Sequence, residues 1–114
     1  MTRRDALRLE DILRSIDEIR FVLNGIDREA FMSDVMRRNS VSMSILVISE
    51  AARHLSASLK STRSDIPWAD VAAIGNIIRH VYFRIDYDAL WTICTTRLDM
   101  LEGAARSMLD HIDD

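Results

Sequence analysis

Hydrophobic residues recur every three or four positions over most of this chain, which is the spacing of one face of an α-helix. The pattern predicts a first helix from Arg4 to Leu23 that ends at Asn24-Gly25, where the left-handed terminating conformation is tolerated. Asp27 is placed to cap a second, short helix that runs to about Val35. Start and stop signals therefore define the first two helices.

A long third helix is predicted over roughly Arg37 to Lys60. Its centre, Ile45 to Ile48, is apolar on every side. Such a segment lies either at the centre of a bundle or also in a subunit interface. Because the apolar surface exceeds what one small core readily hides, we expect a homodimer.

Two further helices follow the polar stretch Ser61 to Asp65. Pro67 suits the first turn of the fourth helix, which is predicted to end near Tyr82 to Ile85. Asp86 is placed to cap the last helix, which runs to about His111. The expected fold is all-α, an antiparallel bundle of four main helices plus one short helix. With 114 residues, the whole chain is expected to form one domain.

Composition narrows the class of protein. The chain is 48% hydrophobic and 29% charged with only 3 Gly and 1 Pro, which excludes disordered and collagen-like proteins. No apolar run approaches the roughly 20 residues of a membrane span, and the charged start does not resemble an export signal. Cys94 is the single cysteine, so no internal disulfide can form. We therefore expect a cytoplasmic protein with no membrane partner.

The net charge of −3 provides no global basic field that would draw the protein onto nucleic acid. The segment Phe31 to Arg63 nevertheless has five basic residues against two acidic ones, whereas Thr92 to Asp114 has the opposite bias. Any site for a polyanion is therefore expected to be local.

Common motifs of helical enzymes are missing from the sequence, including the Glu-x-x-His pairs of di-iron sites and the glycine-rich loops of nucleotide sites. His54, His80 and His111 lie on different segments without the spacing of metal ligands, so we expect neither a metal nor a cofactor. Glu50 and His54 are four residues apart, and we interpret them as a hydrogen-bonded pair on one helix face.

The end of the fourth helix gathers residues that could carry chemistry. Asn76 and His80 are four residues apart and share one helix face. If the helix ends near Tyr82, the side chains of Tyr82 and His80 converge at the C-terminal end of this helix. Beside Arg79 and Arg84, this cluster could bind a phosphodiester and use His80 as a general acid or base near neutral pH. The alternative is a helix end with amphipathic residues and no catalytic role.

Several separate patches of the chain agree in order and spacing with one known family. These patches are Ile48 to Arg53, Ile66-Pro67-Trp68, the run Asn76 to Phe83, Ile85-Asp86-Tyr87 and Trp91. Together they resemble the HepT-like branch of the HEPN superfamily, and the resemblance covers nearly the whole chain. In that branch Gly often stands at the position of Ser49.

The resemblance implies the all-α toxin of a bacterial toxin-antitoxin pair, usually dimeric, with a nucleotidyltransferase of the MntA type as antitoxin. It also implies a metal-independent ribonuclease whose Arg-x4–6-His motif forms a site at the dimer interface. By position, His80 is the motif histidine, Asn76 is the polar residue after the motif arginine, and Tyr82 is the tyrosine to which the antitoxin attaches AMP.

The chain departs from that motif at Gly75, which stands where the motif arginine is expected. An arginine there would clamp the scissile phosphate, and losing one preorganised donor commonly costs about 10²- to 10³-fold in rate. Arg79 projects about 100° away from His80 on a regular helix, so taking over this role would need the partner subunit or a local distortion. A formal Arg-x4-His at Arg106 to His111 lies at a helix end without Asn or Tyr, and we interpret it as chance.

Two hypotheses follow. In the first, the chain is a toxin that cleaves or binds RNA, with His80 as acid and base, Asn76 as the orienting residue and Arg79 or Arg84 on the phosphate. In the second, it is a non-catalytic HEPN binding module that docks the nucleotidyltransferase and accepts its AMP on Tyr82. Gly75 is the feature that favours the second.

Overall fold

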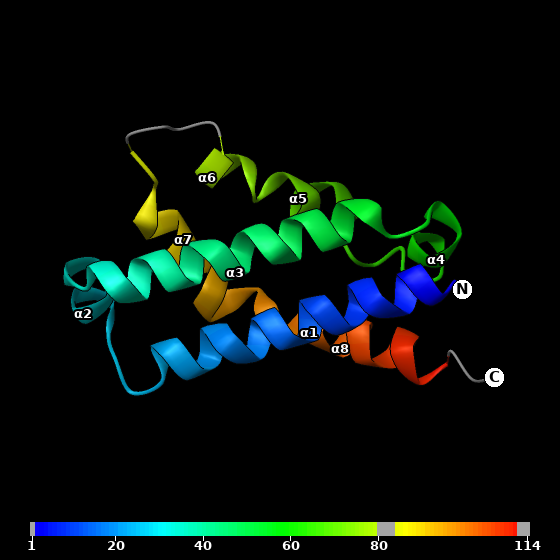
Figure 1. Cartoon of the computed structure of the whole chain (residues 1–114), viewed down its shortest axis with the longest axis horizontal. Coiled ribbons are helices and arrows are strands. Elements are labelled where there is room, and N and C mark those ends of the chain that lie inside the picture. The colour runs from blue at the N-terminus through cyan, green and yellow to red at the C-terminus, as the bar shows by residue number, and fades with distance from the viewer. Residues whose placement is uncertain (1, 80–83, 112–114) are drawn as a thin grey trace.

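The computed structural model describes residues 2–79 and 84–111, and α-helices are its regular secondary structure (Figure 1). In chain order these are α1 (Arg3–Leu23), α2 (Arg28–Ser33), α3 (Val35–His54), α4 (Ala57–Ser61), α5 (Trp68–Ala73), α6 (Asn76–Arg79), α7 (Tyr87–Thr96) and α8 (Leu98–Asp110). The predicted all-α fold is confirmed.

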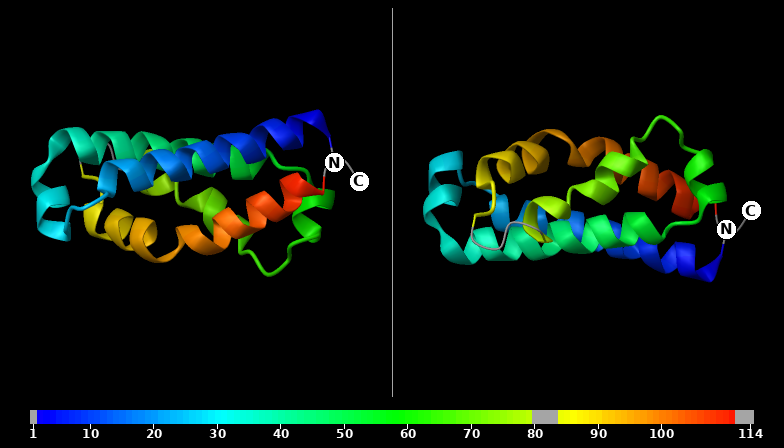
Figure 2. Two further views of the ribbon diagram at one scale, coloured as in Figure 1. Left: turned by 90° about the horizontal axis from the view of Figure 1, so that it is seen from below. Right: turned by 90° about the horizontal axis from the view of Figure 1, so that it is seen from above.

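The two long helices α1 and α3 run antiparallel and side by side, and they form one side of the bundle (Figures 1 and 2). α8 packs against α1 and α5 packs along α3, and both lie on the same face of the α1–α3 pair (Figure 2). α2 contacts both α3 and α7 at the end of the bundle that is remote from the start of α1. Among the described residues, no helix is both long enough and apolar enough to cross a membrane.

Local side-chain bonds explain where the helices begin. Thr2 and Asp5 form a reciprocal capping box at the start of α1. Asp27 accepts the backbone N–H of Ala30 at 2.8 Å, and Asp86 accepts that of Ala89 at 3.0 Å. Gly25 has a φ of +76°, the left-handed conformation that the sequence predicts after α1. The expected caps of α2 and α7 are thus confirmed.

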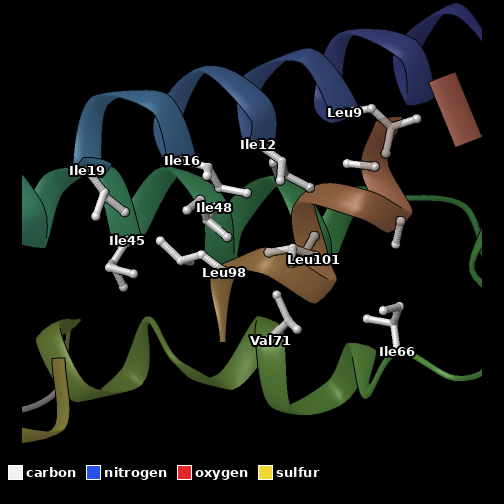
Figure 3. Close-up of a cluster of buried hydrophobic side chains, with 14 of the residues drawn as sticks. Leu9, Ile12, Ile16, Ile19, Ile45, Ile48, Ile66, Val71, Leu98 and Leu101 are labelled. Atoms are coloured by element: carbon white, nitrogen blue, oxygen red, sulfur yellow. The ribbon is translucent and has the colours of Figure 1, made fainter. Parts of the chain in front are cut away.

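The core lies where α1, α3, α5 and α8 meet (Figure 3). Its members are aliphatic side chains at helical spacing, including Leu9, Ile12, Ile16, Ile19, Ile45, Ile48, Val71, Leu98 and Leu101. At the apolar centre of α3, Ile45 and Ile48 are buried, whereas Leu46 and Val47 are only half-buried. The centre of α3 therefore serves the core on one side and leaves apolar surface on the other.

The long helix predicted to reach Lys60 is shorter in the structure, because α3 ends at His54 and α4 begins at Ala57. The interruption falls at Ser56, whose backbone N–H and hydroxyl both donate to the Asp5 carboxylate. The Ser56 hydroxyl also accepts the N–H of Leu59 at 3.3 Å and thereby caps α4. A contact with the start of α1 thus overrides the helical periodicity.

The predicted last helix is likewise divided at Arg97, between α7 and α8. The hydroxyls of Thr95 and Thr96 donate to the carbonyls of Trp91 and Thr92, at 2.8 and 2.6 Å. Such bonds to the preceding turn compete with the backbone ladder and bend helices. The second half, α8, is held to α1 by Arg20, which pairs with Glu102 at 2.7 Å and with Asp99.

Candidate functional site

The predicted fourth helix is two helices, α5 and α6, separated at Ile74 and Gly75. The N–H of Ile74 still donates to the helical carbonyl of Asp70 at 3.1 Å, and also to that of Val71 at 3.3 Å. The N–H of Gly75 donates instead to the hydroxyl of Ser49 on α3, at 3.0 Å. The same hydroxyl donates to the carbonyl of Ala72 at 2.5 Å. A side chain inserted into the ladder in this way interrupts a helix, so the prediction of one continuous helix was wrong.

The contact between α3 and the α5–α6 junction is largely enclosed, with the Ser49–Gly75 bond buried and the Ser49–Ala72 bond part-buried. Ser49 has no exposed surface, and Gly75 is also buried. Because the Ser49 hydroxyl both donates and accepts, its hydrogen-bonding groups are satisfied within the interior. A satisfied polar contact in a dry environment has one preferred geometry, so it fixes how α5 is joined to α6.

The residues predicted for catalysis cluster at and after this junction. Asn76 is the first residue of α6 and is exposed, and Arg79 is its last residue. Arg84 is exposed just before α7. His80 and Tyr82 lie outside the described residues, so the predicted convergence of Asn76, His80 and Tyr82 stays a prediction. The structure does place Asn76 directly after the Ser49 contact.

An aromatic cluster supports the start of α7. Tyr87 packs edge-on against Phe31 with ring centroids 6.3 Å apart, and Trp91 lies 5.5 Å from the same ring. The guanidinium of Arg38, on α3, lies over the Tyr87 ring at 4.7 Å from its centroid. Tyr87 is half-buried in this cluster.

Other candidate groups have structural partners. His54 Nε2 lies 3.2 Å from Glu50 Oε1, which confirms the predicted pair, and Glu50 also accepts a bond from Arg53 at 2.8 Å. Burial raises the pKa of Cys94 to about 12, so its thiol stays protonated and is a poor nucleophile at neutral pH. Within residues 2–79 and 84–111, no group of three His, Cys, Asp or Glu side chains is placed to hold a metal ion.

The formal Arg-x4-His near the C-terminus forms local contacts only. Arg106 lies 3.5 Å from Glu102, and His111 Nδ1 lies 2.6 Å from the carbonyl of Ser107. Both motif residues are exposed at the end of α8. These contacts give no support to a second site there.

A groove of about 760 Å³ opens between α5 and the α7–α8 pair. Its walls are mainly aliphatic, and its charged residues are Asp70, Asp86, Asp88 and Arg97. Asp88 is ion-paired with Arg28, whereas Asp86 caps α7. With carboxylates in excess, the groove repels a phosphate backbone, so an RNA strand is not expected to run along it.

Comparison with known proteins decides the family. The family described as Ribonuclease HepT-like matches residues 12–108 of the chain. The chain belongs to this family. The HepT-like resemblance read from the sequence is therefore confirmed.

The HepT-like chain is similar to several curated proteins along most of its length. It is 33% identical over 94 residues to "Putative RNase MJ1380" of Methanocaldococcus jannaschii, an alignment that covers 82% of this chain and 86% of that protein. It is 28% identical over 95 residues to "Probable ribonuclease HepT" of Thermococcus cleftensis, which covers 83% of this chain and 86% of that protein. No solved structure matches the chain.

Two features of this HepT-like chain were missed by sequence reasoning. Ser49 and Gly75 were seen only as separate departures from the family pattern, yet they are hydrogen-bonded to each other. The signal in the sequence that could have pointed to this hydrogen bond is that both residues depart from the same family pattern. The sequence gives no signal for the contact of Arg38 with the Tyr87 ring, because the hydrophobic periodicity does not specify how the helices of these two residues pack together.

Proposed function

We propose that this HepT-like chain, as one domain, is the toxin of a toxin-antitoxin pair and cleaves RNA without a metal ion. The observation that carries the proposal is the family match over residues 12–108, which spans Asn76, His80 and Tyr82. The exposed position of Asn76 beside the α5–α6 junction is consistent with a role in contacting a ligand.

The proposed reaction is attack of a ribose 2′-hydroxyl on its adjacent phosphate. His80 takes the proton of the 2′-hydroxyl as the O2′–P bond forms, and a proton is returned to the 5′-oxygen as the P–O5′ bond breaks. Asn76 orients the phosphate, and Arg79 or Arg84 balances its charge. The products are a 2′,3′-cyclic phosphate and a 5′-hydroxyl, and the reaction needs no cofactor.

The partners follow from the same proposal. The chain acts as a homodimer, and a nucleotidyltransferase of the MntA type silences it by attaching AMP to Tyr82. The added phosphate places negative charge and bulk two residues after His80, where both would obstruct an RNA phosphodiester.

Cleavage of RNA by the purified protein in the presence of EDTA tests this function. We expect wild type to yield cyclic phosphate ends and His80→Ala to yield none. His54→Ala is the matched control, because it removes a histidine whose partner is Glu50 on α3. Equal cleavage by wild type and His80→Ala would show that the activity comes from a contaminant or another site.

A second function is favoured by one observation, the buried Gly75 in the place of the motif arginine. In this alternative the chain is a non-catalytic module that docks the nucleotidyltransferase and accepts its AMP. It predicts no cleavage by wild type, together with stoichiometric AMP transfer to Tyr82 when the partner and ATP are added.

A further inference from the structure

The α5–α6 junction precedes the candidate catalytic residues along the chain. Asn76 begins α6, and the carbonyl of Gly75 accepts the N–H of Ile78 at 3.1 Å. The direction in which the chain leaves Gly75 therefore determines where Asn76 and the residues after it are carried. That direction depends on what holds the backbone at the break.

Upstream of the break, α5 is held in place by its own contacts. Trp68 is buried and donates its indole N–H to the carbonyl of Arg63 at 3.0 Å, and Val71 belongs to the core. Across the break itself, the hydroxyl of Ser49 bonds the carbonyl of Ala72 on one side and the N–H of Gly75 on the other. Ser49 thus joins the end of the anchored segment to the start of the next.

We infer that Ser49 is a positioning residue for the candidate site: its buried hydroxyl holds the break between α5 and α6 and so sets the direction of α6 and of Asn76. The catalytic part of this inference rests on the proposed function. Ser49 touches neither substrate nor reacting atoms. It acts through the backbone of Ala72 and Gly75.

The chain supplies a matched control on the same helix. Ser44 is also buried, with 4% of its surface exposed, and its hydroxyl donates to Glu18 on α1 at 3.3 Å. Ser49→Ala and Ser44→Ala therefore remove the same atom from two buried sites of α3. Only Ser49→Ala removes a bond to the α5–α6 junction.

The first measurement is amide hydrogen exchange of peptides that cover residues 72–79. Loss of a hydrogen bond worth about 1 kcal/mol is expected to speed exchange there roughly fivefold in Ser49→Ala. Ser44→Ala should leave this segment at the wild-type rate. Equal exchange in the two variants would overturn the inference, whether or not the protein cleaves RNA.

The second measurement is the steady-state kinetics of RNA cleavage. Misplacement of a catalytic group by about 1 Å can cost about 10²-fold, so kcat of Ser49→Ala should fall by 10- to 100-fold while KM changes little. Ser49→Thr keeps the hydroxyl and should recover most of kcat. Ser44→Ala should keep the wild-type kcat at a similar melting temperature.

The outcomes separate the inference from the proposed function. Faster exchange in Ser49→Ala with an unchanged kcat would overturn the positioning role, because α6 would then be free to move without effect on the reaction. A wild-type protein that does not cleave RNA would contradict the proposed function. The exchange experiment would still decide whether Ser49 holds the junction.

Discussion

Asp5, in the first turn of α1, accepts two hydrogen bonds from Ser56 in the turn between α3 and α4, from the backbone N–H at 2.9 Å and from the hydroxyl at 2.7 Å. It also accepts the N–H of Thr2 at 3.3 Å. Burial by itself raises the pKa of Asp5, but the bonds from Ser56 and Thr2 together outweigh it and hold the pKa below its ordinary value. One carboxylate thus ties α1 to the α3–α4 turn.

This arrangement predicts a specific loss of stability in acid. Because the pKa of Asp5 is lower in the folded chain than its ordinary 3.8, its contribution is present above about pH 4 and is lost as pH falls through the folded value. Asp5→Asn should lower the free energy of unfolding at pH 7 by about 1–3 kcal/mol and flatten the loss below pH 4. Urea unfolding between pH 2 and 7 measures both effects.

Asp11→Asn is the control for that series. Asp11 pairs with Arg14 on the surface of α1, at 2.7 Å, and exposed pairs of this kind contribute under about 1 kcal/mol. An Asp5→Asn variant with the acid profile of wild type would show that Asp5 is not the group responsible.

The variant Gly75→Arg tests whether RNA cleavage is limited by the absence of the motif arginine. If wild type is inactive because it lacks a donor there, the variant should raise RNA cleavage from near zero, by up to about 10²- to 10³-fold. The backbone N–H that Ser49 accepts is retained in the variant. Because Gly75 is buried, the melting temperature and the dimer must be measured in parallel.

The same series separates the two proposed functions. If Arg79 already contacts the phosphate, wild type should be active, Arg79→Ala should lower cleavage by about 10²-fold, and Gly75→Arg should add little. If wild type and Gly75→Arg are both folded, dimeric and inactive, the ribonuclease proposal is contradicted and the binding module remains.

Tyr82 rather than Tyr87 is expected to accept AMP. Tyr87 packs against Phe31 and under Arg38, so its ring is already in contact with two other side chains. Peptide mapping by mass spectrometry after incubation with the partner nucleotidyltransferase and ATP should find the added mass on Tyr82. Tyr82→Phe should abolish labelling, and Tyr87→Phe should leave it unchanged. A label on Tyr87 would contradict the assignment.

A homodimer is expected from the apolar surface of α3. Met43 is 62% exposed, and Val35 and Met36 near the start of the helix are exposed as well. Light scattering at tens of micromolar should give twice the monomer mass for wild type. Met43→Glu should shift the mass toward the monomer, whereas Met100→Glu, at a 53% exposed methionine on α8, should not. A monomeric wild type would count against both the dimer and a shared site.

The sequence predicts those elements of the fold whose signals are local. The caps at Asp27 and Asp86 and the turn at Gly25 follow from residues within a few positions of one another, and all three are present. The breaks at Ser56 and Gly75 are different, because each is made by a side chain from a distant helix, Asp5 or Ser49. Apolar spacing runs through both breaks, so periodicity alone could not predict them.

For the candidate site, the sequence predicts the residue types and their order along the chain. The structure adds the hydrogen bonds of Ser49 to the α5–α6 junction that precedes them. The exposure of Asn76 agrees with its proposed role, but neither spacing nor helical geometry pointed to Ser49 as its support. A helical wheel treats residues 68–82 as one regular helix. It therefore cannot represent a backbone whose helical hydrogen bonds are interrupted at residue 75.

Because the Gly75 backbone donates to the Ser49 side chain, substitutions at positions 75 and 49 are expected to have different effects. Every residue except proline has a backbone N–H that can donate to Ser49, so most substitutions at position 75 leave this bond available. Substitutions at position 49 keep the site's own side chains and change how they are aimed. If Ser49 holds the junction as we infer, mutations on α3 change the activity of this protein without altering any group that meets its ligand.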